Sequence, residues 1–194
     1  MISSLAWLVF LSFFSGLSVN LILQCGLGMA GFAGFQERKL PLIKIGLGFV
    51  SVMLLWFFFS YIIPPMAMGF FGYMLLFPAP ALVNAGLEYL LFVIILKRGV
   101  EREESGFFYD GLAGAALFVT LTLANSFMDA VALGFGFASG IALTLLILGE
   151  IRRRAAMEAV PRFLRGSPLT IVSMGLLSLV SGAVAVILFG ALGG

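Results

Sequence analysis

The chain has 194 residues, of which 62% are hydrophobic and 10% are charged, and its formal net charge is +2. A soluble globular domain has roughly a quarter of its residues charged. This composition therefore excludes a soluble globular domain and indicates an integral membrane protein. The chain has no His and one Cys, Cys25, which excludes His-ligated haem or zinc, Ser-His or Cys-His catalytic pairs, an internal disulfide and a CxxC site.

Six apolar runs predict an all-α integral membrane protein with six transmembrane helices. A span needs about 20 residues, so six spans nearly use up the chain, and we predict a single transmembrane domain over residues 1–194. The first run has no basic residue ahead of it and no clear cleavage site, so it is predicted to be a retained span. The predicted spans are Leu5 to Gly28, Ile43 to Ile63, Ala67 to Leu96, Phe107 to Leu123, Ala130 to Ile151 and Leu169 to Leu192.

Two similar four-residue runs occur at matching places: GMAG, from Gly28 to Gly31, follows the first apolar segment, and GLAG, from Gly111 to Gly114, opens the fourth. An odd number of spans per unit inverts the second unit, so we predict two inverted three-helix repeats, about 1–97 and 105–194. Such repeats often meet near the bilayer midplane through interrupted helices, here helices 1 and 4. The alternative is that these small residues only serve helix packing.

The third run is too long for one simple span. Its roughly 30 residues would extend about 45 Å as a helix, against a hydrocarbon core of about 30 Å. Pro78 and Pro80 lie inside it. A proline ring removes a helical hydrogen bond and clashes with the preceding turn, so the break is predicted at this pair.

The fifth span contains a surface of small residues. Gly136 and Gly140 are one helical turn apart, and small residues at this spacing allow a second helix to approach closely. We interpret the surface as a packing face. Its members are Gly134, Gly136, Ala138, Ser139 and Gly140.

Carboxylates within or beside a span are costly and mark candidates for an ion path. Glu88 is nine residues before Lys97, about 13 Å along a helix. It either accepts a translocated proton or sodium ion, or forms a structural hydrogen bond with a group such as Asn84 or Ser60. Asp110, at the opening of the fourth span, either belongs to the same ion path or caps that helix.

Other polar residues are predicted to be structural. Asn125 and Asp129 lie in a short turn and are predicted to cap the two helices that flank it. Glu150 precedes an arginine run, and we predict an ion pair with Arg154 one helical turn later.

All eleven Lys and Arg residues fall in three short loops, which alternate with turns that have none. The positive-inside bias therefore predicts that these loops face the cytoplasm and that both termini lie outside. The cations are Arg38, Lys39, Lys44, Lys97, Arg98, Arg102, Arg152, Arg153, Arg154, Arg162 and Arg165.

Four segments of the last third form a recognisable pattern: GFGFASG from Gly134, EIRRR from Glu150, VPRFLRG from Val160 and GLLSL from Gly175. Without a gap they resemble the fifth span, loop and sixth span of the Rnf and Nqr membrane subunit family, in particular its A-type member in Rnf and its E-type member in Nqr. The run VN at residues 19–20 and the segment LGMAGFAG at 27–34 are similar to that family's first span and its interruption. A glutamate also stands in the family's third span, at the position of Glu88.

This resemblance implies a six-helix fold of two inverted repeats, paired with a related subunit of opposite topology. In the family the two chains hold an iron-sulfur cluster between them, each giving a cysteine from its first and fourth spans. Those positions fall on Ala30 and near Gly111 here. A [2Fe-2S] cluster needs four ligands, usually thiolates, so we predict none at these positions. Cys25 lies five residues before Ala30 and could ligate only after a rearrangement.

The resemblance also implies the function. We predict a multi-pass subunit of the prokaryotic cytoplasmic (inner) membrane, part of a redox-driven complex that translocates sodium or protons and not an enzyme by itself. Its expected partners are membrane lipid and other redox subunits, without nucleic acid. We expect no cofactor or metal in this chain alone, and any [2Fe-2S] cluster or flavin belongs to the complex. The alternatives are a small inverted-repeat transporter of an ion or solute, and a structural membrane anchor for redox subunits.

Overall fold

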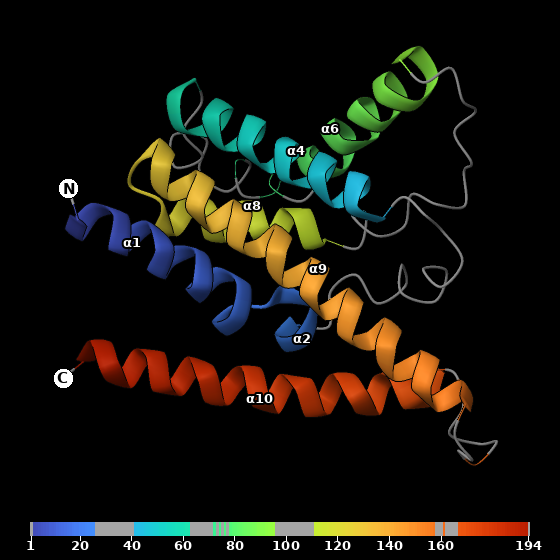
Figure 1. The fold of residues 1–194 in the computed structure, drawn as a ribbon. Coiled ribbons are helices and arrows are strands. Elements are labelled where there is room, and N and C mark those ends of the chain that lie inside the picture. Colours follow the sequence, from blue (N-terminus) through green and yellow to red (C-terminus); the bar gives the residue numbers. More distant parts are fainter. Residues whose placement is uncertain are drawn as a thin grey trace.

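The computed structural model describes residues 2–25, 41–62, 78–95, 111–157 and 167–193, together with 72, 74, 76 and 161. Every regular element in these ranges is a helix, and the long helices lie roughly side by side in one bundle (Figure 1). The prediction of an all-α protein is therefore confirmed for the part of the chain that the structure describes.

The first helical segment is interrupted near its C-terminal end. α1 (Ile2–Phe13) continues into the π-helix η1 (Phe14–Ser18), and α2 (Leu21–Cys25) follows after a two-residue break. The break comprises Val19 and Asn20, eight residues before the Gly28 that the sequence indicated. The backbone N–H of Val19 still donates to the carbonyl of Phe14 at 3.0 Å, an i to i+5 bond that closes the π turn. Gly28, Ala30 and Gly31 lie outside the described residues.

Proline is the first residue of two further helices. α4 is Pro41–Tyr61 and α6 is Pro78–Tyr89, which continues as the π-helix η4 (Leu90–Ile95). Proline suits the first helical position, because its missing N–H would have no partner there and its φ is already helical. The break predicted at Pro78 and Pro80 is therefore a helix start at Pro78.

In the C-terminal half, the described residues form one short helix and two long ones. α8 is Leu112–Leu123, α9 is Phe127–Met157 and α10 is Ser167–Gly193. Between α8 and α9, Ser126 Oγ accepts from the N–H of Asp129 at 3.2 Å, and Asp129 Oδ2 accepts from the N–H of Ser126 at 3.1 Å. This reciprocal pair is a capping box, so the predicted capping of this helix by Asp129 is confirmed.

α9 is the central helix of the bundle. It contacts α1, η1, α2, α4, α8 and α10, and it crosses the whole bundle in Figure 1. The side chains of the core lie on the faces through which these helices contact one another.

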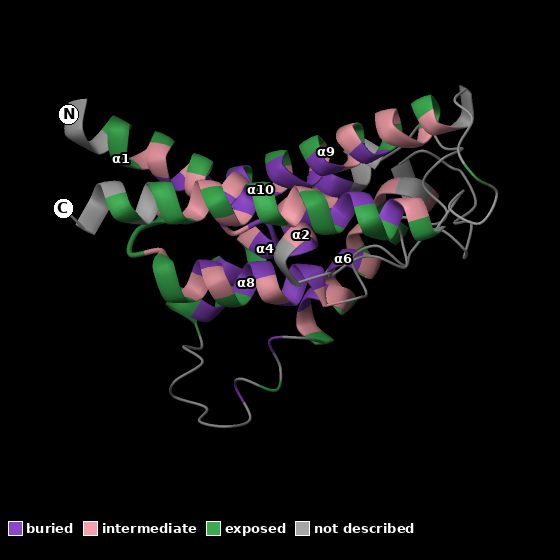
Figure 2. Ribbon diagram, turned by 90° about the horizontal axis from the view of Figure 1, so that it is seen from below, coloured by how far each residue is buried: buried purple, intermediate pink, exposed green. Residues whose placement is uncertain are grey.

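Apolar residues are also exposed on the outside of the bundle, such as Leu179 and Val186 of α10, each 72% exposed. Figure 2 shows such exposed turns along α1 and α10. Outward apolar faces are what a bilayer requires.

Within the described residues, three helical segments are long and apolar enough to cross a membrane: Leu5–Leu23, which includes the break at Val19 and Asn20, Phe127–Ala155 and Pro168–Ile187. They correspond to the first, fifth and sixth predicted spans. Ile45–Tyr61 and Leu112–Leu123 are apolar but shorter. The chain is therefore a membrane protein, and six complete spans remain a prediction.

Candidate functional site

The break between η1 and α2 lies inside the bundle, where α2 contacts both α8 and α9. In Figure 1 the beginning of α8 and the whole of α2 lie near the middle of the long axis of α9. Two helix ends with backbone groups that cannot bond within their own helix therefore lie close together in mid-bundle. We take this junction as the candidate site.

Asn20 is the residue that holds the break in place. Its Oδ1 accepts from the backbone N–H groups of Ile22 at 3.2 Å and Leu23 at 3.3 Å, so the side chain caps α2. Its Nδ2 lies 2.9 Å from Thr144 Oγ1, 3.2 Å from the Gly16 carbonyl and 3.3 Å from the Gly140 carbonyl. One buried amide thus links η1, α2 and α9.

Serine hydroxyls make further bonds across the same helices. Ser12 Oγ donates to the carbonyl of Ala132 and Ser15 Oγ to that of Leu133, both at 3.0 Å. From α10, Ser181 Oγ donates to the carbonyl of Leu17 at 2.6 Å. Leu17 belongs to η1, so the π segment is fixed by hydrogen bonds on two sides.

Glycines allow this close contact. A Cβ on Gly16 would lie 2.8 Å from the carbonyl oxygen of Gly136, and a Cβ on Gly140 would lie 2.9 Å from the Cα of Gly16. Both distances are too short for a real side chain. The packing role predicted for the small residues of the fifth span is confirmed at Gly136 and Gly140.

Gly111 precedes α8 and occupies its N-cap position, with φ of +82° and no side-chain capping bond. L-residues rarely adopt this left-handed conformation, because their Cβ crowds the backbone. Gly114 lies buried in the first turn of α8. Asp110 lies outside the described residues. The N-cap position is Gly111, and a cap by the Asp110 side chain stays a prediction.

Glu88 is buried in α6, with 5% of its surface exposed. Asn84, one turn earlier and fully buried, donates from Nδ2 to Glu88 Oε1 at 3.4 Å. The pairing predicted with Asn84 is therefore confirmed, whereas Ser60 is exposed. The other amide atom, Asn84 Oδ1, has no hydrogen-bond partner among the residues that the structure describes.

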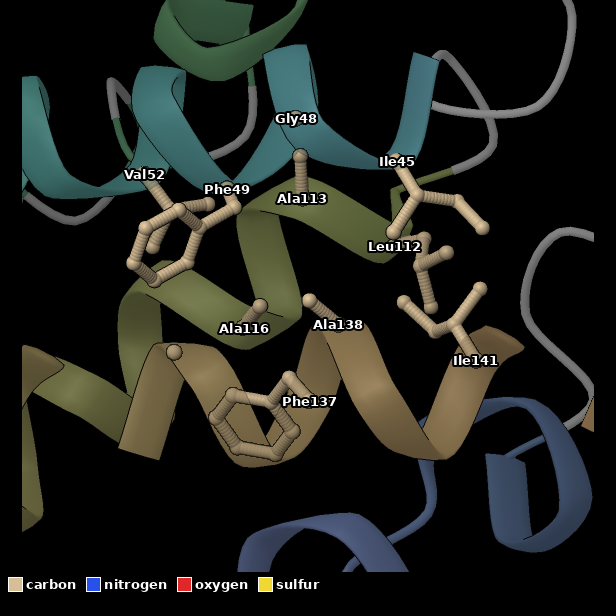
Figure 3. Close-up of a pocket in the computed structure, with 11 residues that line it drawn as sticks. Ile45, Gly48, Phe49, Val52, Leu112, Ala113, Ala116, Phe137, Ala138 and Ile141 are labelled. Atoms are coloured by element: carbon tan, nitrogen blue, oxygen red, sulfur yellow. The ribbon is translucent and has the colours of Figure 1, made fainter. Parts of the chain in front are cut away.

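A small cavity lies between α4, α8 and α9 (Figure 3). Its volume is about 20 Å³, which is room for about one water molecule. Figure 3 shows Phe49, Phe137 and Ile141 among its apolar walls. This space cannot hold a flavin or an iron-sulfur cluster.

The described residues also contain no group of three or more His, Cys, Asp or Glu side chains that could hold a metal ion. Cys25 is the last residue of α2, five residues after Asn20, and its side chain lies outside the described part of the chain. The prediction that Cys25 could act as a ligand only after a rearrangement therefore stays a prediction.

The basic end of α9 contains a small ion-pair network. Glu150 pairs with Arg153 and with Arg154, and both Nε to carboxylate distances are 2.9 Å. The predicted pair with Arg154 is confirmed, and Arg153 is an additional partner. Arg152 Nε instead donates to Thr170 Oγ1 at 2.9 Å, which joins the end of α9 to the beginning of α10.

The sequence patterns did not single out Thr144 or the bridging serines of this site, and they named Asn20 only as part of the VN run, without a role. The signal at Asn20 was present: an Asn immediately before the apolar residues of α2 is a typical helix N-cap. Thr144 gave no local signal, because its role depends on contact with a residue 124 positions earlier.

No family model matches this chain. The chain is 27% identical over 176 residues to the A-type subunit of the ion-translocating oxidoreductase complex of Cronobacter sakazakii, a match covering 82% of this chain and 86% of the relative. The protein of the same name from Azoarcus is 24% identical over 170 residues with the same coverage. A shorter match, 36% identical over 66 residues and covering 34% of each chain, is to the protein of this name in Actinobacillus pleuropneumoniae.

Proposed function

We propose, from the premise that this chain is a divergent relative of the Rnf and Nqr membrane subunits, that it is a membrane subunit of a redox-driven ion-translocating complex. The observation that supports this most directly is the interrupted first helix: α2, the segment that follows the break, contacts α8 inside the bundle. The proposed partners are the other subunits of such a complex, including a related six-helix subunit of opposite topology.

Helix directions and contacts support the proposed inverted repeats. α1 runs opposite to α8, and α4 runs opposite to α9 (Figure 1). In the proposed repeats, α1 and α2 correspond to α8, α4 to α9 and α6 to α10. Each contact then has a counterpart: α1 with α9 corresponds to α8 with α4, α9 with α10 to α4 with α6, and α2 with α10 to α8 with α6. A two-fold axis in the membrane plane would produce this pattern. The repeats are about 1–97 and 105–194, with both termini outside and the basic loops in the cytoplasm of a prokaryote.

The residues of this chain do not fit the family's cluster. At Gly111 the backbone is left-handed and there is no side chain, so a thiolate is absent and a cysteine would be strained. Ala30 has only a methyl group. With one cysteine in the sequence, the chain cannot supply two thiolate ligands. We therefore assign any cluster or flavin of the assembly to its other subunits.

Glu88 is the proposed ion-path residue. A buried carboxylate in a membrane helix is costly unless it is protonated or paired, and Glu88 accepts a hydrogen bond from Asn84 Nδ2. The fully buried Asn84 Oδ1 adds an oxygen one helical turn away. Carboxylate and amide oxygens suit a proton or a hard cation such as sodium. Asp110 is proposed for the same path from its sequence position.

Purifying the chain with the membrane proteins it retains, and then measuring iron, flavin and visible absorbance, tests this function. We expect redox subunits to co-purify and the iron content to be unchanged in Cys25→Ser. Loss of stoichiometric iron in Cys25→Ser would contradict the assignment of the cluster to other subunits. Absence of every redox subunit, together with solute uptake by the chain alone, would favour the transporter.

A further inference from the structure

An open groove runs along the outside of the bundle between α9 and the α1–η1 segment. Its volume is about 490 Å³. Its floor contains the closely packed Gly16 and Gly140, and its rims contain exposed apolar side chains such as Phe135 and Leu146, which are 63% and 70% exposed. In a bilayer, a groove of this kind faces acyl chains.

The α9 side of this groove continues into a charged surface. Ser139, Leu143 and Leu146 line the groove, and Glu150 and Arg153 follow on α9 at spacings of four and three residues. Residues spaced three and four apart lie on one face of a helix. The groove therefore leads along one face of α9 to its arginines.

The arginines lie at the right depth for a lipid headgroup. The apolar helix Phe127–Ala155 has its middle at residue 141, and Arg153 is twelve residues further, about 18 Å along the axis. Half of the hydrocarbon core is about 15 Å thick. If the helix is centred in the bilayer, its groove lies in the hydrocarbon and its arginines lie among the phosphates.

The charges there favour an anion. The side chains of Arg153 and Arg154 are each 70% exposed, and together with Glu150, which pairs with both, they carry one net positive charge. A guanidinium has five N–H donors, and the bonds with Glu150 use two of those of Arg153. Arginine binds phosphate through paired donors.

We propose that this face of α9 binds an anionic phospholipid, with an acyl chain in the groove and the headgroup phosphate at Arg153 and Arg154. The groove alone would accept any acyl chain, and the arginines alone would attract any anionic surface. Their continuity along one helix face selects a lipid that has both parts. This proposal is independent of electron transfer.

The test is native mass spectrometry of the full chain, purified with its retained partners and titrated with phosphatidylglycerol or phosphatidylcholine. For the double variant Arg153→Gln/Arg154→Gln we expect about a tenfold weaker retention of phosphatidylglycerol and a smaller loss with phosphatidylcholine, whose choline cation offsets the charge of its phosphate. Arg162→Gln/Arg165→Gln removes the same charge from the chain beyond α9 and should change retention less than twofold.

Ala142→Phe fills the groove without changing any charge and should also weaken phosphatidylglycerol retention. Leu146→Trp, at an exposed position on the rim, serves the same purpose if Ala142→Phe lowers the yield. Equal losses in the two double arginine variants would overturn the proposal, because they indicate attraction without a site. Unchanged retention in both groove variants, or a photo-crosslinker at position 146 that attaches to a protein instead of lipid, would overturn it as well.

Discussion

At the scale of single residues, Asn20 is the side chain on which the helix break depends. It caps α2 through Oδ1 and bonds three oxygen atoms of η1 and α9 through Nδ2. Interhelical hydrogen bonds inside membranes are individually weak, about 0.6 kcal/mol on average. A single residue that makes several such bonds and a cap contributes more, because its removal leaves buried backbone groups without partners.

We therefore expect Asn20→Ala to lower the free energy of unfolding by about 1–3 kcal/mol, measured by denaturation in mixed micelles. Asn20→Asp keeps the cap acceptor but turns a carboxylate oxygen toward the carbonyls of Gly16 and Gly140, so it should be no more stable than Asn20→Ala. Thr122→Ala is the control, because Thr122 is exposed and its hydroxyl bonds, among the described residues, to the carbonyls of Phe118 and Val119 in its own helix. A fully stable Asn20→Asp variant would show that the Nδ2 bonds do not matter.

Glu88, the proposed ion-path residue, allows a test of function by a single substitution. If its carboxylate takes up the translocated ion, Glu88→Gln should abolish ion uptake that is coupled to electron transfer in proteoliposomes of the assembly. Glu150→Gln makes the same chemical change at a partly exposed ion pair and should retain coupling. Unchanged coupled uptake in Glu88→Gln would remove this residue from the ion path.

At the scale of elements, backbone contact between α9 and the α1–η1 segment positions the break. Gly140 has no room for a Cβ, whereas a Cβ on Gly175 of α10 would meet nothing within 4 Å. Gly140→Ala should therefore force the two helices apart and cost about 1–3 kcal/mol. Gly175→Ala should leave stability unchanged or raise it slightly, since Ala favours helix more than Gly does. Thermal unfolding of both variants measures the difference, and equal melting temperatures would refute the close packing.

Sequence patterns predicted the elements better than their junctions. The apolar runs predicted the long helices, and the proline pair predicted a break where α6 begins. The small residues of the fifth span predicted the face through which that helix packs. A break in the first helix was expected at Gly28, because glycine is the usual marker of an interruption, and that residue lies outside the described part of the chain. The break at Val19 and Asn20 was not predicted, because it depends on the π turn and on Thr144 of α9, a contact that local sequence does not contain.

At the scale of the whole molecule, the charge distribution predicts the orientation. In a Cys25→Ser background, a cysteine at Glu104 should react with a membrane-impermeant maleimide only from the cytoplasmic side. A cysteine at Asn125, in the turn between α8 and α9, should react only from outside. Reaction of both positions from the same side would contradict the proposed topology.

The candidate site was predictable only in part at this scale. Charge and hydropathy indicated a membrane bundle, and the buried pair of Glu88 and Asn84 was anticipated from sequence. The missing thiols at Ala30 and Gly111 could be read by comparison with the family. The left-handed backbone at Gly111 could not, because φ is set by how α8 begins against its neighbours.

The central claim is that this chain serves a redox-driven ion translocator. It is tested most directly by purifying the chain with its partners from the native membrane, reconstituting them in proteoliposomes and measuring sodium and proton uptake with and without a reduced electron donor. We predict uptake of one of these ions that requires both the donor and this chain. Ion or solute uptake by the chain alone, at the same rate without any donor, would contradict the claim.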